Sequence, residues 1–198
     1  MDIRRRLFTI AAAAALLTHG AAYAAEDTIK IGVSGPYTGG SSSMGVSMRD
    51  GVRLAAKEIN AAGGINGKKI ELIERDDEAK NERGVQIAQE LINKEKVVAN
   101  VGYINTGVAL ASQRFYQEAK IPVMNNVATG TILTKQFTGD NYIFRNAARD
   151  AIQAPMIVKE AIDKRGFKKV AILADSTNYG QLGREDLEKA LKEKGITV

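Results

Sequence analysis

Short apolar runs alternate along this chain with stretches in which apolar residues recur at helical spacing. The short runs, several of them rich in β-branched residues, predict strands at 28–34, 70–74, 97–102, 121–124, 142–145 and 170–174. The stretches with helical spacing predict helices around 48–59, 81–92, 108–119, 154–162 and 187–191. Strands that alternate with helices of this length indicate parallel β-α-β units with right-handed crossovers. The pattern therefore predicts an α/β fold with a doubly wound parallel sheet.

The alternation is interrupted between residues 133 and 141 and starts again near Asp150. This change predicts an N-terminal α/β lobe over residues 25–148 and a second, incomplete α/β lobe over residues 149–198. Residues 196–198 resemble the start of another strand, and no helix follows them. We interpret the chain as a fragment or a truncated gene product on that ground.

The first 24 residues have the pattern of a secretory signal peptide. A positive start with three arginines precedes an apolar core over residues 7–18, and Ala22-Tyr23-Ala24 supplies the small residues of a cleavage site. We expect cleavage near Ala24 and disfavour the alternative, an amphipathic helix of the mature fold. The sequence contains no cysteine, so disulfides and a lipid-anchored cysteine are excluded. These features predict a soluble protein of a bacterial periplasm.

Charge and residue types exclude several other classes of protein. The net charge is +5, and about +3 remains outside the leader, without a basic block of the kind that nucleic-acid binding requires. The only histidine, His19, lies in the leader. The mature chain therefore has no Ser-His-Asp or Cys-His nucleophile system and no usual zinc ligand set. We expect a protein that is not an enzyme and that has no cofactor and no metal.

Two small polar loops follow neighbouring predicted strands, at residues 103–107 and 125–129. Ligands of open α/β sheets bind outside the carboxyl ends of the strands. Thr106, Gly107 and Thr129 offer hydroxyls and backbone N–H groups there, which suits an anion such as a carboxylate. The alternative is that Thr106 caps its helix and Thr129 only makes a turn. The sequence pattern leaves both interpretations open.

Other motifs carry less information about function. The glycines of the 35–45 loop have no G-x-G-x-x-G spacing, and residues 63–69 have the wrong glycine spacing and order for a phosphate loop. The serines at 41–43 could contact a ligand or cap a helix, and Tyr179 could stack on a ligand or be an exposed aromatic. The acidic residues at 76–78 favour helix capping over metal binding or catalysis.

Several segments resemble the leucine/isoleucine/valine-binding proteins of ABC transporters. These are TIKIGVSGPYTG, GVRLAAKEINAAGGINGKKIELIERDD, the loop Gly-Tyr-Ile-Asn-Thr, IPVMNNVATG and KKVAILADSTNYG. The resemblance covers essentially all of the mature chain. It implies the type I periplasmic-binding-protein fold, in which two α/β lobes joined by hinge strands close on a solute.

The resemblance also implies roles for particular residues. Thr106 would bind the carboxylate of the solute, together with the adjacent Asn105 and Gly107. Val127 would offer a backbone carbonyl to an ammonium group of the solute. Thr129 would supply both its hydroxyl and its N–H to the solute. The facing lobe would contribute Tyr179, and Ser43 belongs to a first-loop contact over residues 42–44. That segment lacks the aromatic residue common in amino-acid binders, and Asn126 stands where a proline is common. The resemblance therefore does not identify the solute.

The implied function is the extracytoplasmic solute-binding component of an ABC uptake transporter for branched-chain or related amino acids. The alternative is a ligand sensor of the same fold for amides, urea or aromatic acids. The implied partners are a small solute with a carboxylate and ABC permease subunits, with no nucleic acid, and the full-length protein is expected to be a monomer.

Overall fold

The structure is a computed structural model, and it describes residues 28–198. The predicted signal peptide therefore lies outside the described residues. Five parallel strands form one sheet in the order β2-β1-β3-β4-β5. Their bounds are β1 Ile29–Gly35, β2 Ile70–Asp76, β3 Ala99–Val101, β4 Val123–Asn125 and β5 Ile143–Arg145. The predicted α/β class and the parallel sheet are confirmed.

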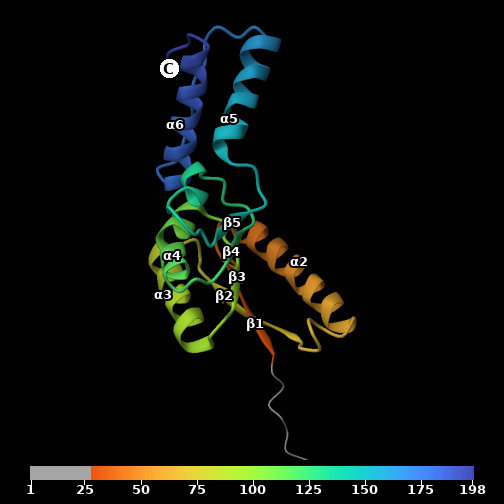
Figure 1. The fold of residues 1–198 in the computed structure, drawn as a ribbon. Coiled ribbons are helices and arrows are strands. Elements are labelled where there is room, and N and C mark those ends of the chain that lie inside the picture. The colour runs from red at the N-terminus through yellow and green to blue at the C-terminus, as the bar shows by residue number, and fades with distance from the viewer. Residues whose placement is uncertain (1–27) are drawn as a thin grey trace, which may run out of the picture.

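Helices within residues 28–148, the part of the chain predicted as the first lobe, cover both faces of this sheet, as Figure 1 shows. On one face lies α2, Ser42–Ala61, which contacts β1 and β2. On the other lie α3, Asn81–Glu90, which continues as a π-helical turn, and α4, Thr106–Glu118. Side chains between α3, α4 and the sheet form the main core, and the fully buried ones include Leu91, Tyr103, Val108, Tyr116, Val123 and Leu133.

The connection between α2 and β2 is a tight turn that one glycine and one asparagine hold in place. Gly64 has φ +80°, and a Cβ there would lie 2.1 Å from the carbonyl oxygen of Lys68, so the turn requires glycine. The amide of Asn60 accepts a hydrogen bond from Ile70 N at 2.7 Å and donates one to Ile70 O at 2.8 Å. The end of α2 and the start of β2 are therefore fixed to each other.

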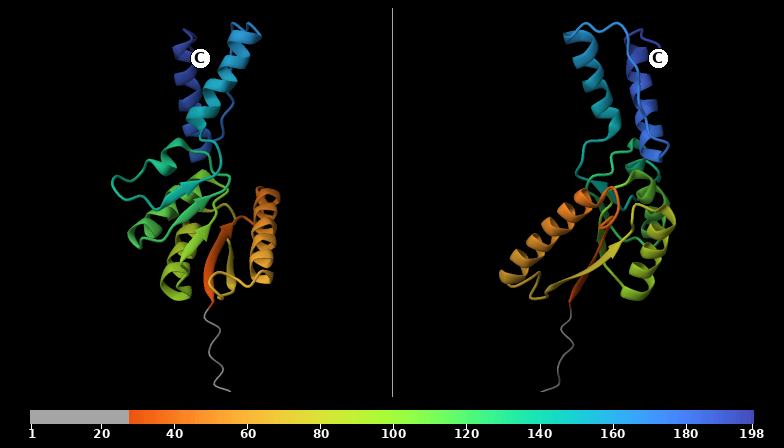
Figure 2. Two further views of the ribbon diagram at one scale, coloured as in Figure 1. Left: turned by 45° about the vertical axis from the view of Figure 1, so that its right-hand side comes forward. Right: turned by 180° about the vertical axis from the view of Figure 1, so that it is seen from behind.

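The second part of the chain is a pair of adjacent helices, which Figure 2 shows standing beyond the carboxyl edge of the sheet. These are α5, Asp150–Val158, which continues as a π-helical turn over Lys159–Lys164, and α6, Asn178–Glu193. A small core of Ala154, Val158, Ala190 and Leu191 joins them. None of the helices within residues 28–198 is long and apolar enough to cross a membrane.

The strands predicted at 170–174 and 196–198 are wrong for this structure, which has no strand in either segment. Val170, Ile172 and Ile196 pack against the core of the helix pair, whereas Leu173 is fully exposed. A strand exists only when a neighbouring strand satisfies its backbone groups. Within residues 149–198 neither segment has such a neighbour, so a strand-like composition yields an extended connection.

Candidate functional site

The two polar loops that follow β3 and β4 are in direct contact. The backbone N–H groups of Val127 and Ala128 both donate to the carbonyl oxygen of Tyr103, at 3.3 and 3.1 Å. The N–H of Gly130 donates to Oγ1 of Thr106 at 3.4 Å. Because the parallel strands end at the same edge, loops far apart in the sequence form one surface.

The N-cap residue of α4 is Asn105 rather than Thr106, so the helix-capping alternative for Thr106 is wrong. Asn105 makes no capping hydrogen bond with its side chain, and its amide instead donates to Oγ of Ser41 at 3.3 Å. Thr106 is the first helical residue and only 1% exposed. Its hydroxyl faces Gly130, so in this arrangement a solute would meet mainly the backbone at the start of α4.

A cleft of about 980 Å³ lies beside these loops, between the first lobe and the start of α6. The first residues or N-cap residues of four helices line it: Ser41 of α2, Lys80 to Glu82 of α3, Asn105 to Gly107 of α4, and Thr177 to Tyr179 of α6. Each helix N-terminus carries a partial positive charge, and the first N–H groups of a helix have no partner within it. The side chains of Thr177 and Asp175 already pair groups at the start of α6. The arrangement therefore favours an anion.

Gly107, near the start of α4, lies close to the first residues of two other helices. A Cβ on Gly107 would lie 2.9 Å from Oδ1 of Asn81 on α3 and 2.9 Å from Oδ1 of Asn178 on α6. Both asparagines line the cleft and were missed by the sequence reasoning. The available signal was their position: each is the first residue of a helix that follows a strand or a strand-like segment.

The turn that carries Thr129 is held by groups near the start of α5. Arg145 donates from Nη1 to Thr129 O at 3.0 Å and from Nη2 to Gly130 O at 2.7 Å, and Asp150 N donates to Thr129 O at 3.0 Å. Burial raises the pKa of the Asp150 carboxyl, and a hydrogen bond with the side chain of Thr129 opposes that shift. The backbone of Thr129 is therefore held in its turn.

Tyr179 lies in the first turn of α6. The hydroxyl of Thr177 caps α6 by accepting from Gly180 N at 3.5 Å, and Asp175 accepts from Thr177 N at 2.8 Å. The helix therefore begins before the tyrosine, whose side chain is 53% exposed at the wall of the cleft.

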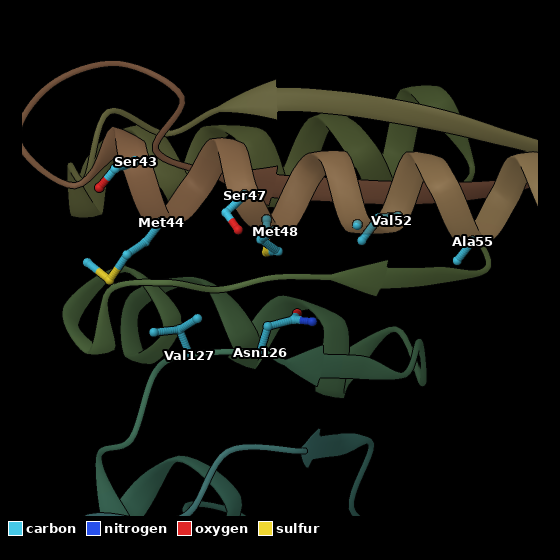
Figure 3. A pocket seen from close by; sticks show the side chains of 9 residues that line it. Ser43, Met44, Ser47, Met48, Val52, Ala55, Asn126 and Val127 are labelled. Atoms are coloured by element: carbon cyan, nitrogen blue, oxygen red, sulfur yellow. The ribbon is translucent and has the colours of Figure 1, made fainter.

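All the predicted site residues except Ser43 line the cleft. Ser43 instead lines a neighbouring cavity of about 640 Å³ between α2 and the loop after β4, drawn in Figure 3. Met44 extends there from α2 toward Val127, and these two side chains line both spaces. The predicted first-loop contact at residues 42–44 therefore reaches the cleft through Met44.

The acidic residues at 76–78 order the turn before α3. Asp76 accepts from Tyr37 N, Thr38 Oγ1 and Glu78 N, at 2.8, 2.7 and 2.9 Å. Burial raises the pKa of Asp76, but these hydrogen bonds outweigh it and leave the pKa below its ordinary value. Asp77 is 1% exposed, and burial raises its pKa to about 6. Among residues 28–198 no group of His, Cys, Asp and Glu could hold a metal ion.

Comparisons with known proteins identify relatives along almost the whole chain. A family model described as "Periplasmic binding protein" matches residues 28–198. A Pseudomonas aeruginosa protein named "Leucine-, isoleucine-, valine-, threonine-, and alanine-binding protein" is 29% identical over 194 residues, which cover 98% of this chain and 51% of that protein. Another protein of that species, named "Amino acid binding protein", is 34% identical over 84% of this chain and 44% of its own length. The chain spans about half the length of these curated relatives.

Solved structures show the same fold. The substrate-binding protein of a branched-chain amino acid transporter from Streptococcus pneumoniae, in complex with isoleucine, is 30% identical with a TM-score of 0.76, over 83% of this chain and 47% of that one. An ABC-transporter solute-binding protein from Rhodopseudomonas palustris BisB5, in complex with 3,4-dihydroxybenzoic acid, is 32% identical with a TM-score of 0.75, over 87% and 46%.

Proposed function

This chain belongs to the periplasmic binding protein family, and we propose that it serves as the extracytoplasmic solute-binding component of an ABC uptake transporter. The solute is a small molecule with a carboxylate, in the first instance a branched-chain or related amino acid. The family consists of binding proteins, which agrees with the expectation that the chain is not an enzyme. The observation that carries the proposal is the convergence of four helix N-termini on one cleft.

The proposed carboxylate site is the start of α4. The N–H groups of Thr106 and Gly107 lie at a helix N-terminus whose N-cap side chain makes no capping bond, so a bound anion can take that place. Asn105 lies at the same edge of the cleft. Charge-assisted hydrogen bonds of this kind contribute about 1.5–3 kcal/mol each. Three or four of them, less the cost of immobilising the solute and closing the lobes, give an affinity near micromolar, about −8 kcal/mol.

The proposed ammonium site is formed by Val127 and Thr129. A backbone carbonyl at Val127 is an acceptor, as the resemblance implies. The hydroxyl of Thr129 has lone pairs that can accept a hydrogen bond from the solute. An ammonium group needs acceptors of this kind. Tyr179 and Met44 would then contact the remainder of the solute.

A second candidate is the uptake or sensing of an aromatic acid. The relative in complex with 3,4-dihydroxybenzoic acid is about as similar to this chain as the amino-acid binders are. Such a solute has a carboxylate and no ammonium group, so it would use the α4 site and leave the acceptors at Val127 and Thr129 without a charged partner. The solute panel that tests the proposal should therefore contain both chemical classes.

The test is a thermal-shift and calorimetric screen of the full-length protein, unfolded and refolded beforehand to remove any bound solute. A solute at a hundred times its dissociation constant adds about 2.7 kcal/mol to the free energy of unfolding. We expect one amino acid or aromatic acid to raise the melting temperature and Thr129→Val to weaken its binding. If only amino-acid binding weakens in this variant, the ammonium assignment is supported; if neither class binds the wild type, the proposal fails.

Periplasmic export, release of the leader near Ala24, a monomeric state and delivery to ABC permease subunits belong to the same proposal. Deletion of a neighbouring permease gene tests delivery. Loss of solute uptake favours transport, whereas intact uptake with loss of a regulatory response favours the sensor alternative.

A further inference from the structure

One face of α6 lies against the first lobe. Asn178, Leu182 and Asp186 occupy every fourth position of the helix and therefore share a side of it. Each of the three is close to a residue of the first lobe, and α4 and α6 are in contact. We refer to these three residues as the α6 stripe.

The outer end of the α6 stripe makes a directed hydrogen bond to the first lobe. Oγ1 of Thr131 donates to Oδ2 of Asp186 at 2.7 Å. Oγ1 of Thr131 also accepts a hydrogen bond from the N–H of Ala151, at the start of α5, at 2.8 Å. Thr131 thus joins the loop that follows β4, the start of α5 and the middle of α6.

The rest of the α6 stripe approaches positions where the first lobe has no side chain. Oδ1 of Asn178 lies 2.9 Å from the Cβ position of Gly107, and Cδ1 of Leu182 lies 3.6 Å from that of Gly130. These glycines flank the proposed solute-binding groups of the two loops. The backbone at Gly107 and Gly130 therefore determines both how closely α6 packs on the first lobe and the shape of the solute-binding loops.

We propose that the α6 stripe is an interlobe latch, which docks the second lobe on Gly107, Gly130 and Thr131 and holds the cleft closed around a bound solute. The inference rests on the proposed function in that a bound solute would add to the stability of the latched state, which the α6 contacts also favour without a solute. Asp186 does not line the cleft, so it acts by positioning α6 and not by touching the solute.

The test measures the distance between the lobes and the affinity for solute in the full-length protein. The sequence contains no cysteine, so Lys57→Cys on α2 and Lys189→Cys on α6, both exposed in the wild type, accept a pair of spin labels. Asp186→Ala and Thr131→Val each remove the hydrogen bond. Glu193→Ala, an exposed carboxylate at the far end of α6, is the matched control.

We expect Asp186→Ala and Thr131→Val to broaden the interlobe distances and to weaken solute binding at least tenfold, about 1.4 kcal/mol. The double variant should lose no more than Thr131→Val alone, because Thr131→Val already removes the bond to Asp186 as well as the acceptor for Ala151 N. Glu193→Ala should stay within twofold of the wild type. Equal behaviour of Asp186→Ala and the control, or tighter binding in Asp186→Ala, would overturn the latch.

Two measurements test the latch independently of the proposed function. If no solute of the panel binds the wild type, the proposed function fails, but the distances without solute still compare Asp186→Ala with its control. Gly107→Ala provides a steric version of the test, with Gly183→Ala as its control, since a Cβ at Gly183 has no atom within 4 Å. Distances unchanged in both Asp186→Ala and Gly107→Ala would refute the latch whether or not a solute is known.

Discussion

Asp77 offers a test of the electrostatics beneath the site, because it is a carboxyl group in the interior beside the turn that starts α3. Its Oδ1 accepts from Ala79 N at 2.9 Å, whereas Oδ2 has no hydrogen-bond partner among the described residues. Burial raises its pKa to about 6, against the bond from Ala79 and the attraction of Arg83, and the adjacent Asp76 adds to the rise. The charged form is therefore disfavoured in the folded protein.

The sign of the effect follows from the folded pKa lying above the ordinary value of 3.8. Between these two values the folded state binds more protons than the unfolded state, so the free energy of unfolding falls as pH rises from about 4 to about 6. The full difference corresponds to about 3 kcal/mol, since one pKa unit is worth about 1.4 kcal/mol. Above about pH 6 the whole of this destabilisation is present.

Asp77→Asn removes the buried charge and keeps the acceptor for Ala79 N. The new amide NH2 group takes the place of Oδ2, where no hydrogen-bond partner is available among the described residues. A buried donor without a partner lowers the free energy of unfolding by about 1–2 kcal/mol. We therefore expect Asp77→Asn to raise the free energy of unfolding by about 1–2 kcal/mol at pH 7.5. As pH falls toward 4 the gain disappears and the cost of the amide remains, so the variant should become about 1–2 kcal/mol less stable than the wild type. Urea denaturation between pH 4 and pH 8 measures both quantities.

Asp76→Asn is the control, because its carboxylate accepts three hydrogen bonds and its pKa is lowered. A lowered pKa means that the charge stabilises the fold above the ordinary pKa, so this variant should lose stability at pH 7.5. If Asp77→Asn also destabilises at pH 7.5, or if its effect is the same at pH 4 and pH 8, the reasoning about the buried carboxyl is refuted.

Three further predictions concern packing, a turn and the site. Leu91→Ala, in the core at 0% exposure, should lower the free energy of unfolding by about 2–5 kcal/mol, whereas Leu54→Ala, 57% exposed, should change it by less than about 0.5 kcal/mol in the same urea titration. Asn60→Ala should cost about 1–3 kcal/mol, because both backbone groups of Ile70 lose their partner; a change below about 0.5 kcal/mol would contradict this. Arg145→Lys should weaken solute binding about tenfold by calorimetry, since a lysine ammonium lacks the planar fork by which two guanidinium nitrogens each hold one carbonyl; unchanged affinity would show that the turn does not need this geometry.

The arrangement of the first lobe could be predicted from sequence because its strands have neighbours that satisfy the structure their composition favours. Each predicted strand there pairs with a neighbour, and α3 and α4 bury their apolar sides in the main core, whereas much of the apolar side of α2 stays exposed. The strand predicted at 170–174 has the same composition but no neighbour within residues 28–198. Composition indicates what a segment can form, and hydrogen-bond partners decide whether it does.

The candidate site could be predicted only in part. The loops after β3 and β4 could be predicted as site loops because adjacent parallel strands bring their carboxyl ends together. Asn81 and Asn178 were not, because their approach to Gly107 depends on how three helices are oriented. The assignment of Asn105 as the cap of α4 also required backbone geometry, since Asn and Thr are both good capping residues.

The central claim is that the cleft binds the carboxylate of a small solute at the start of α4. The most direct test is calorimetry of the refolded full-length protein with its best-binding solute and with the carboxamide of that solute, which has nearly the same shape and no negative charge. The account predicts that the amide binds at least a hundredfold more weakly, about 2.7 kcal/mol. Equal affinity for the acid and the amide would contradict it.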